Sequence, residues 1–260
     1  MKNTDCLPPE RQGSAYFFLG KDAAPWCLGG FLILLLLACN KPTPPPQPAF
    51  FHWKTQLALN NAERACLDSL GCRYLYVKFL DIAREDGIIQ TYALMELAAT
   101  AGLSEKTVTP CVFITNNVFQ SISENELDWL AEKTVQALNS VGKQFSEQPF
   151  PEFQFDCDWT AGTRAAFFSF LKKIRNRLSD GCRISATIRL HQYKFPDRTG
   201  VPPADRGMLM LYNTGDIDDL DAGNSIFQTV DAEKYILGAA PYPLPLEAAL
   251  APGAAAGFES

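Results

Sequence analysis

The sequence has few of the residues on which metal sites and nucleic-acid interfaces depend. It contains only two histidines, His52 and His191, and no Cys-x-x-Cys pair, so we expect no metal site. Its formal net charge of -6 at pH 7 argues against a nucleic-acid partner, because such proteins present a basic face. We therefore expect neither a cofactor nor a nucleic acid among its ligands.

The sequence also lacks an apolar run long enough for a comfortable membrane span, which needs about 20 residues. Residues 27–38 form a shorter run, whose length is typical of a signal-peptide core. The run ends in Leu-Leu-Ala-Cys at positions 36–39, which resembles the lipobox cut by the lipoprotein signal peptidase. The resemblance implies that residues 1–38 are removed and that lipid on Cys39 holds the protein to a membrane. Because Asn40 rather than aspartate follows, it also implies the outer membrane of the cell envelope.

Two further segments follow the expected cleavage site. Residues 39–49 comprise the lipidated cysteine and a proline-rich stretch, which predicts an extended, semi-rigid tether. Residues 50–260 suffice for one domain with a sizeable core, and the hydrophobic fraction of 47% is that of a globular protein. The leader before residue 27 carries both signs of charge, which a start site placed too far upstream would explain.

Cysteines are few in this domain, and their number is odd. Three of them, Cys111, Cys157 and Cys182, lie in apolar, strand-like runs and are interpreted as buried free thiols. Cys66 and Cys72 either form a local disulfide or remain free.

Apolar runs alternate with helical patterns along the domain. The predicted strands are residues 50–56, 73–80, 109–115, 153–159, 182–190, 208–212 and 244–250. The predicted helices are residues 60–70, 91–101, 123–141, 163–178 and 219–235. This rhythm predicts an α/β fold with a parallel sheet, and it fits a (β/α)₈ TIM-like barrel better than an open sheet. No eighth strand is evident after residue 250, so the barrel is expected to be incomplete at the C-terminus; a doubly wound open sheet is the alternative.

The fourth and fifth predicted strands each divide into an apolar and a polar face. In a strand, residues two apart share a face, so Asp156 and Asp158 point one way, as do Arg189 and His191 on the next strand. Since active sites of such barrels lie at the C-terminal ends of the strands, we expect these four side chains to line the mouth. Two neighbouring carboxylates can raise one another's pKa and so provide a proton donor. The alternative is a salt bridge from the aspartates to Arg189 or Lys78.

Residues 155–160, Phe-Asp-Cys-Asp-Trp-Thr, resemble the fourth-strand motif D-x-x-D-x-D-x-E of glycoside hydrolase family 18. Residues 210–213, Met-Leu-Tyr-Asn, are similar to the M-x-Y-D motif on that family's sixth strand. The resemblance implies that Asp156 and Asp158 orient the substrate's acetamido group and that Tyr212 supports the reaction intermediate. Arg189, His191 and Asn213 are the further candidates for substrate binding. His191 is either a proton shuttle or a structural, hydrogen-bonded residue.

The sequence departs from that family where the chemistry is most demanding. Phe153 stands in place of the first aspartate, Asn213 replaces the last one, and Thr160 replaces the glutamate that acts as general acid. Threonine cannot protonate a leaving group. Glu247, near the end of the seventh predicted strand, is the other candidate for the acid; alternatively it is an ordinary exposed glutamate. It is a candidate because many retaining glycosidases built on barrels place one carboxylate after strand four and another after strand seven, about 5 Å apart.

Residues 186–192 and 205–213 also resemble a group of barrel lipoproteins of Bacteroides-type bacteria, to which no activity is assigned. Three hypotheses follow. The first is an envelope lipoprotein whose barrel binds glycan with weak or no hydrolysis. The second is an active glycosidase that uses Asp156 or Asp158 with Glu247, and the third is a structural or interaction lipoprotein. Four aromatic residues near the expected mouth either stack on sugar rings or belong to the core: Trp53, Trp159, Tyr193 and Tyr212.

Overall fold

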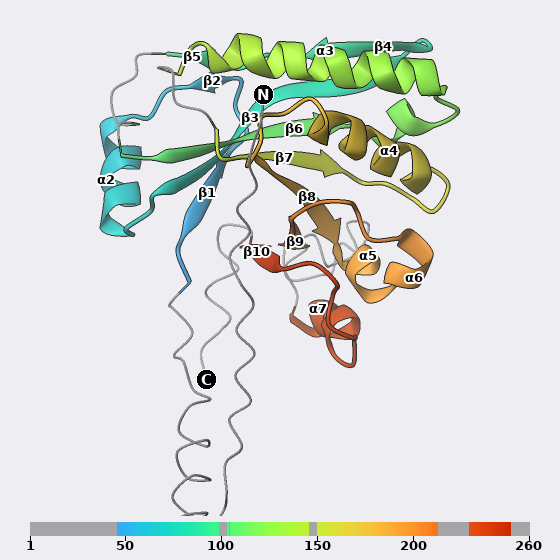
Figure 1. Ribbon diagram of the computed structural model, residues 1–260. Coiled ribbons are helices and arrows are strands. Elements are labelled where there is room, and N and C mark those ends of the chain that lie inside the picture. The colour runs from blue at the N-terminus through green and yellow to red at the C-terminus, as the bar shows by residue number, and fades with distance from the viewer. Residues whose placement is uncertain (1–45, 99–102, 104, 146–149, 213–228, 251–260) are drawn as a thin grey trace, which may run out of the picture. The chain divides into compact units, whose positions relative to one another are not determined.

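Seven parallel strands form the centre of the domain (Figure 1). The computed structural model describes residues 46–98, 103, 105–145, 150–212 and 229–250. The strands are β1 (Ala49–His52), β3 (Tyr74–Glu85), β6 (Thr107–Ile114), β7 (Glu152–Cys157), β8 (Arg183–Arg189), β9 (Arg206–Leu211) and β10 (Leu246–Leu250). Each pairs in parallel with the next in this order, which is the strand order of a (β/α)₈ barrel. The predicted α/β barrel class is confirmed.

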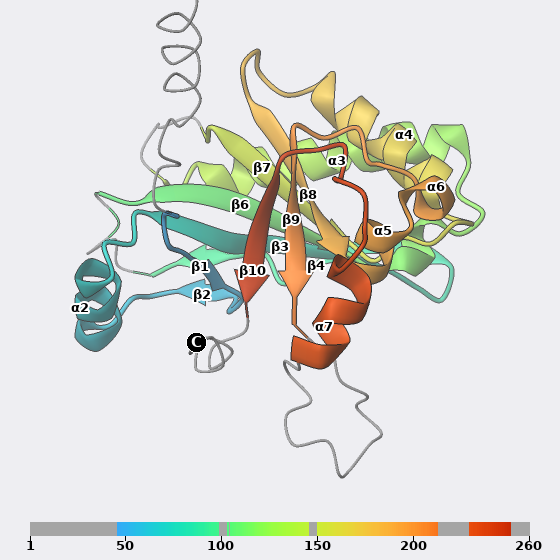
Figure 2. The same cartoon turned by 90° about the horizontal axis from the view of Figure 1, so that it is seen from below.

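In the described part of the chain, the sheet curls around a lumen without closing. Tyr76, on the second of these strands, donates a hydrogen bond of 2.8 Å to Glu247 on the seventh, so the two ends of the sheet approach each other across the lumen. Figure 2 shows β1 and β10 at the two ends of the curved sheet. Within the described ranges no strand pairs with their outer edges, so this part of the chain forms an incomplete barrel.

Three amphipathic helices lie close to the predicted ranges, although the third ends three residues earlier than predicted. They are α2 (Asn61–Ser69), α3 (Glu124–Gly142) and α4 (Arg164–Arg175). Asn60 and Ser123 cap α2 and α3 with a reciprocal capping box, each accepting from the backbone of a glutamate three residues on. Gly71, with φ of +62°, follows the end of α2 in the left-handed conformation that favours glycine.

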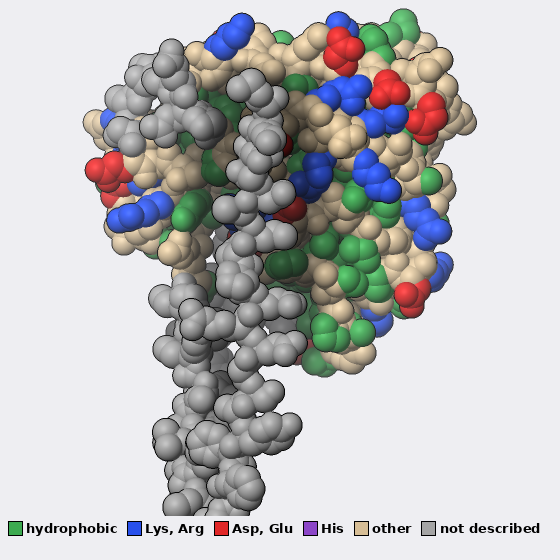
Figure 3. Space-filling model, in the orientation of Figure 1, with side chains coloured by type: hydrophobic (Ala, Val, Ile, Leu, Met, Phe, Trp, Pro, Cys, Tyr) green, Lys and Arg blue, Asp and Glu red, His purple; other side chains and the backbone are tan. Residues whose placement is uncertain are grey.

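α3 and α4 pack side by side over the outer face of the sheet (Figure 1). Ion pairs join their exposed surfaces: Lys173 lies 2.9 Å from Asp128 and 3.1 Å from Glu124, and Arg177 lies 3.2 Å from Asp128. On the face seen in Figure 3, acidic side chains lie beside lysine and arginine side chains at the upper right, in the region of α3 and α4. The basic end of α4 is largely neutralised by its neighbours.

The helix predicted at residues 91–101 is wrong. β3 continues past the barrel and turns back at Asp86 and Gly87 into β4 (Ile88–Tyr92), which pairs with it antiparallel. Both turn residues have positive φ, 49° and 81°, as a two-residue hairpin turn requires. β5 (Glu96–Leu97) then pairs with β2 (Gln56–Leu57) in a separate two-stranded sheet.

Short helices complete the described chain: η1 (Asn116–Phe119), α5 (Leu190–Lys194), α6 (Pro196–Thr199) and α7 (Thr229–Ile236). α7 covers only the end of the predicted helix 219–235, whose beginning lies outside the described residues. None of the described helices is both long enough and apolar enough to cross a bilayer.

Candidate functional site

The two faces of β7 separate the core from the lumen. Phe155 and Cys157 are fully buried against the helix layer, where the ring of Phe155 meets that of Phe170 on α4 at 5.8 Å. Gln154 and Asp156 point the other way, toward the lumen: Gln154 accepts from Cys111 on β6, and Asp156 accepts from Thr187 on β8. The alternation predicted for this strand is thus present in the structure.

A hollow of about 360 Å³ lies at the C-terminal ends of these strands. Its lining residues are Trp53, Lys78, Asp81, Phe113 and Asp156. They come from β3, β6 and β7 and from the segment just after β1. The hollow is therefore at the end of the strands where barrels carry their active sites.

Asp156 is the most constrained group of the hollow. Its side chain is 6% exposed, accepts a hydrogen bond of 2.6 Å from Thr187 Oγ1, and lies 3.5 Å from Nη2 of Arg189. Burial raises the pKa of this carboxyl, and the nearby charge of Asp158 adds to the rise, while Arg189 and Thr187 partly oppose it. The salt bridge that the sequence left as an alternative is formed by Arg189, whereas Lys78 pairs with Asp81 at 2.8 Å.

Other predicted site residues surround Asp156 less closely. Asp158 follows the end of β7 and is exposed. Tyr212 is half-buried, and burial raises its pKa while the adjacent Arg189 partly offsets the rise. Asn213 lies outside the described residues.

The predicted place of His191 at the mouth is wrong. β8 ends at Arg189 and the chain turns at once into α5, so strand alternation no longer fixes the direction of the next side chains. His191 is exposed on α5 and does not line the hollow.

Thr160 occupies the position at which the resemblance calls for a glutamate. It forms part of the turn into α4, where its backbone N–H donates to Thr163 Oγ1 at 3.0 Å and its carbonyl accepts from Arg164 at 2.9 Å. Thr163 in turn donates to Asn116 at 2.6 Å. None of these hydroxyl and amide groups is acidic enough to protonate a leaving group.

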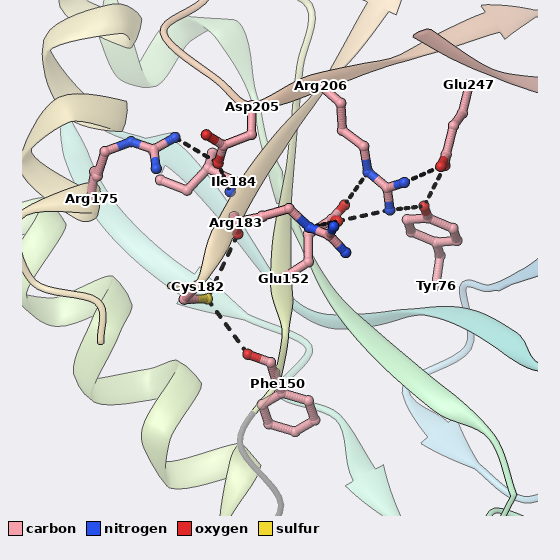
Figure 4. A network of polar contacts seen from close by, with 10 residues as sticks. All are labelled: Tyr76, Phe150, Glu152, Arg175, Cys182, Arg183, Ile184, Asp205, Arg206 and Glu247. Atoms are coloured by element: carbon pink, nitrogen blue, oxygen red, sulfur yellow. Dashed lines mark hydrogen bonds and ion pairs between the residues drawn. The ribbon is translucent and has the colours of Figure 1, made fainter. Parts of the chain in front are cut away.

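Glu247 lies at the opposite end of the lumen. It is the second residue of β10, and it joins the network drawn in Figure 4 with Tyr76, Arg206 and Glu152. Arg206 lies 2.7 Å from Glu152, which is 1% exposed and is also 3.4 Å from Arg183. These residues come from the beginnings of their strands, so the network closes the N-terminal end of the lumen.

The structure does not bring Glu247 together with Asp156. Glu247 lies at the level of Glu152, which precedes Asp156 by four residues on β7. A strand rise of about 3.3 Å per residue places the α-carbons of Glu152 and Asp156 about 13 Å apart. A retaining pair needs carboxyl groups about 5–5.5 Å apart, so Glu247 is not positioned to work with Asp156.

Between the two ends, the lumen carries buried polar atoms that have no hydrogen-bond partner among the described residues. Cys111, Gln154 and Ser185 stand opposite one another on β6, β7 and β8, and all are at most 1% exposed. Nε2 of Gln154 and Oγ of Ser185 have no hydrogen-bond partner among the described residues. Buried polar groups of this kind are normally satisfied by ordered water or a ligand.

The aromatic residues named from the sequence have different environments. Trp53 borders the hollow, is 39% exposed, and stacks on Phe51 at 5.5 Å. Trp159 is fully buried, stacks on Phe167 of α4 and donates to the Thr199 carbonyl, so it is unable to contact a ligand. Tyr193 stacks on Tyr242 at 5.9 Å, away from the hollow.

The thiols of the described domain are all free. Cys111 and Cys157 are fully buried, and burial raises the pKa of both, so they behave as apolar residues. The disulfide between Cys66 and Cys72 is absent: Cys66 is exposed on α2, while Cys72 is buried and donates to the Tyr74 carbonyl. Within the described ranges, no three acidic, cysteine or histidine side chains gather as a metal site would require.

Three solved structures resemble this chain. The chitinase domain of the spore coat protein CotE from Clostridium difficile is 12% identical with a TM-score of 0.50, over 82% of this chain and 67% of that one. The described residues thus share the (β/α)-barrel fold of this domain. The chitinase RmChi1 from Rhizomucor miehei is 13% identical (TM-score 0.48, 78% of this chain and 62% of that one). The spore cortex-lytic enzyme SleL from Bacillus cereus is 14% identical (TM-score 0.43, 67% and 44%).

At these identities the likeness concerns the fold alone, and the chain spans between 44% and 67% of the length of the three structures. No protein family matches the chain, and no curated protein does. The candidate site residues named from the sequence did not include Asp81 and Phe113 at the hollow, Thr187 beside Asp156, or Glu152 and Arg206 at the opposite end. Thr187 and Phe113 follow from strand alternation, but no sequence signal placed Asp81 in the lumen.

Proposed function

We propose that this chain is an envelope lipoprotein whose chitinase-like barrel binds a glycan in the hollow beside Asp156, with hydrolysis weak or absent. The observation that carries the proposal is the hollow itself. It lies at the C-terminal ends of the strands and combines a buried, positioned carboxyl with exposed aromatic surface at Trp53. Sugars suit such a site, since their hydroxyl groups donate to carboxylates and their apolar faces pack on aromatic rings.

Weak or absent hydrolysis follows from Thr160 and from the distant position of Glu247. A general acid typically contributes about 10²–10⁴-fold in rate, so its loss leaves little turnover. One observation favours the active alternative: burial holds the pKa of Asp156 above its ordinary value, which makes this residue the best proton donor of the hollow.

Attachment to the membrane belongs to the same proposal. Cys39 and the residues up to 45 lie outside the described part, and the lipobox resemblance alone supports lipidation there. The tether then connects directly to β1, whose first residue is Ala49.

Calorimetric titration of the full chain in detergent tests the binding. The probes are chitotetraose, cellotetraose, xylotetraose and mannotetraose, with product analysis after long incubation. We expect saturable binding of at least one probe, weakening of at least about tenfold in Asp156→Asn, and no released sugar. Asp128→Asn, which removes an exposed ion-paired carboxylate on α3, is the matched control and should bind normally.

Absence of binding to every probe would contradict the proposal and favour a structural lipoprotein. Turnover that is lost in Asp156→Asn but not in Glu247→Gln would instead establish a glycosidase with Asp156 as its acid.

A further inference from the structure

The wall of the hollow opposite Asp156 depends on an irregularity in β3. Pairing with β6 runs regularly up to Lys78, which stands opposite Cys111, and resumes with Leu80 opposite Val112. Phe79 is therefore an extra residue, a β-bulge of the kind that redirects side chains near functional sites. Phe79 and Leu80 both point to the helix layer and are fully buried.

The bulge places Lys78 and Asp81 on the same face. Three positions apart in a regular strand, they would point to opposite sides of the sheet. Instead both line the hollow, and Nζ of Lys78 lies 2.8 Å from Oδ2 of Asp81. The other carboxylate oxygen, Oδ1, is buried and has no hydrogen-bond partner among the described residues. Buried acceptors are normally satisfied by water or a ligand, and the Asp81 side chain as a whole is 23% exposed where it lines the hollow.

Asp81 and Asp156 stand on either side of Phe113. Asp81 is opposite Phe113 in the pairing of β3 with β6, and Phe113 is opposite Asp156 in the pairing of β6 with β7. With neighbouring strands about 4.8 Å apart, the α-carbons of the two aspartates are about 10 Å apart. The floor of the hollow is therefore an aromatic ring between two carboxylates, each held by its own cation.

We propose that Asp81, positioned by Lys78, and Phe113 form a second part of the glycan site. One pyranose ring lies over Phe113, and its hydroxyl groups are directed to Asp81 and Asp156. The proposal rests on the glycan binding proposed above. Each carboxylate already has a partner of opposite charge, so the wall fits an uncharged, hydroxyl-rich ring better than a charged group. Lys78 acts through Asp81 as a positioning residue, and Asp81 itself contacts the sugar.

Titration of the full chain with the tetrasaccharide that binds best tests this assignment. We expect Asp81→Asn to weaken binding about 10- to 100-fold, the loss typical of a hydrogen bond to a charged group. Phe113→Leu should weaken binding as well, and Lys78→Met should weaken it less than Asp81→Asn. The matched control is Asp68→Asn, because Asp68 also pairs with a lysine, Lys106 at 2.7 Å, but lies away from the hollow.

Thermal unfolding of the same variants separates ligand contact from stability. A sugar-contacting Asp81 predicts that Asp81→Asn loses affinity at temperatures well below its unfolding midpoint, where the variant is folded, whereas Asp68→Asn keeps normal affinity. Normal affinity in both Asp81→Asn and Phe113→Leu, with binding lost in Asp156→Asn, would overturn this inference and leave the proposed function standing. No binding by the unmodified chain would overturn both.

Discussion

Replacement of Glu152 by glutamine tests whether the network at the N-terminal end of the lumen stabilises the open barrel. The Glu152 side chain is 1% exposed, contacts Arg206 through both oxygens at 2.7 and 3.0 Å, and lies 3.4 Å from Arg183. Removing one partner of a buried ion pair costs about 3–5 kcal/mol, because the remaining charge stays desolvated. Arg206 retains Glu247 as a partner, so we expect the lower part of that range.

Glu247→Gln is the informative comparison within the same network. Its side chain is 42% exposed, and glutamine can still accept the hydrogen bond from Tyr76. We expect its substitution to lower the free energy of unfolding by only about 1 kcal/mol. Glu124→Gln, which removes a 73% exposed partner of Lys173, should change it by less than about 0.5 kcal/mol and is the control.

Urea unfolding of the full chain, followed by tryptophan fluorescence to which the buried Trp159 contributes, measures these differences. The expected order of destabilisation is Glu152→Gln, then Glu247→Gln, then Glu124→Gln. If Glu247→Gln lowers the free energy of unfolding as much as Glu152→Gln does, or more, the reasoning is refuted, since burial would then not govern the energetics of the network.

Three further predictions concern other parts of the chain. Cys39→Ser should leave an uncleaved precursor without lipid, and unchanged incorporation of radiolabelled palmitate would contradict the lipobox interpretation. Gly207→Ala should lower the thermal midpoint, because an added β-carbon would lie 2.7 Å from Leu246 and 2.8 Å from Ile188; an unchanged midpoint would show that these neighbours move freely. Because the pKa of Asp156 is raised on folding, the folded protein binds the proton more tightly than the unfolded chain does. The contribution of Asp156 to stability should therefore fall as pH rises from about 4 through the folded pKa. It is measured as the difference in unfolding free energy between the unmodified chain and Asp156→Asn across pH, and this difference should change by at most about 1.4 kcal/mol per pH unit.

Most of the barrel could be predicted because each of its strands is a short apolar run followed by a turn signal. All seven predicted strands are present, and two of the predicted helices begin where Asn60 and Ser123 act as N-caps. The hairpin after β3 was missed although Asp86-Gly87 is a strong hairpin signal. Residues 91–101 have helical spacing, but strand pairing determines their described part: residues 91–92 pair with β3, and residues 96–97 pair with β2.

The site was predictable only where regular alternation holds. Asp156 and Arg189 lie inside β7 and β8, and alternation assigned both to the lumen. His191 was misplaced because its strand ends two residues earlier. Glu247 was misplaced because the sequence does not show which end of a short strand it occupies, and β10 begins only at Leu246.

The bulge at Phe79 also determines how β3 can change in evolution. Tyr76 before it and Asp81 after it both face the lumen, and alternation is regular on either side. Deleting Phe79 would join the two regular segments without exchanging their faces, at the expense of the packing of Phe79 on neighbouring rings. Deleting a residue within β7 would instead turn Asp156 toward the helices. Deletion of one residue is therefore tolerable at Phe79 of β3, whereas deletion of one residue within β7 would abolish the site.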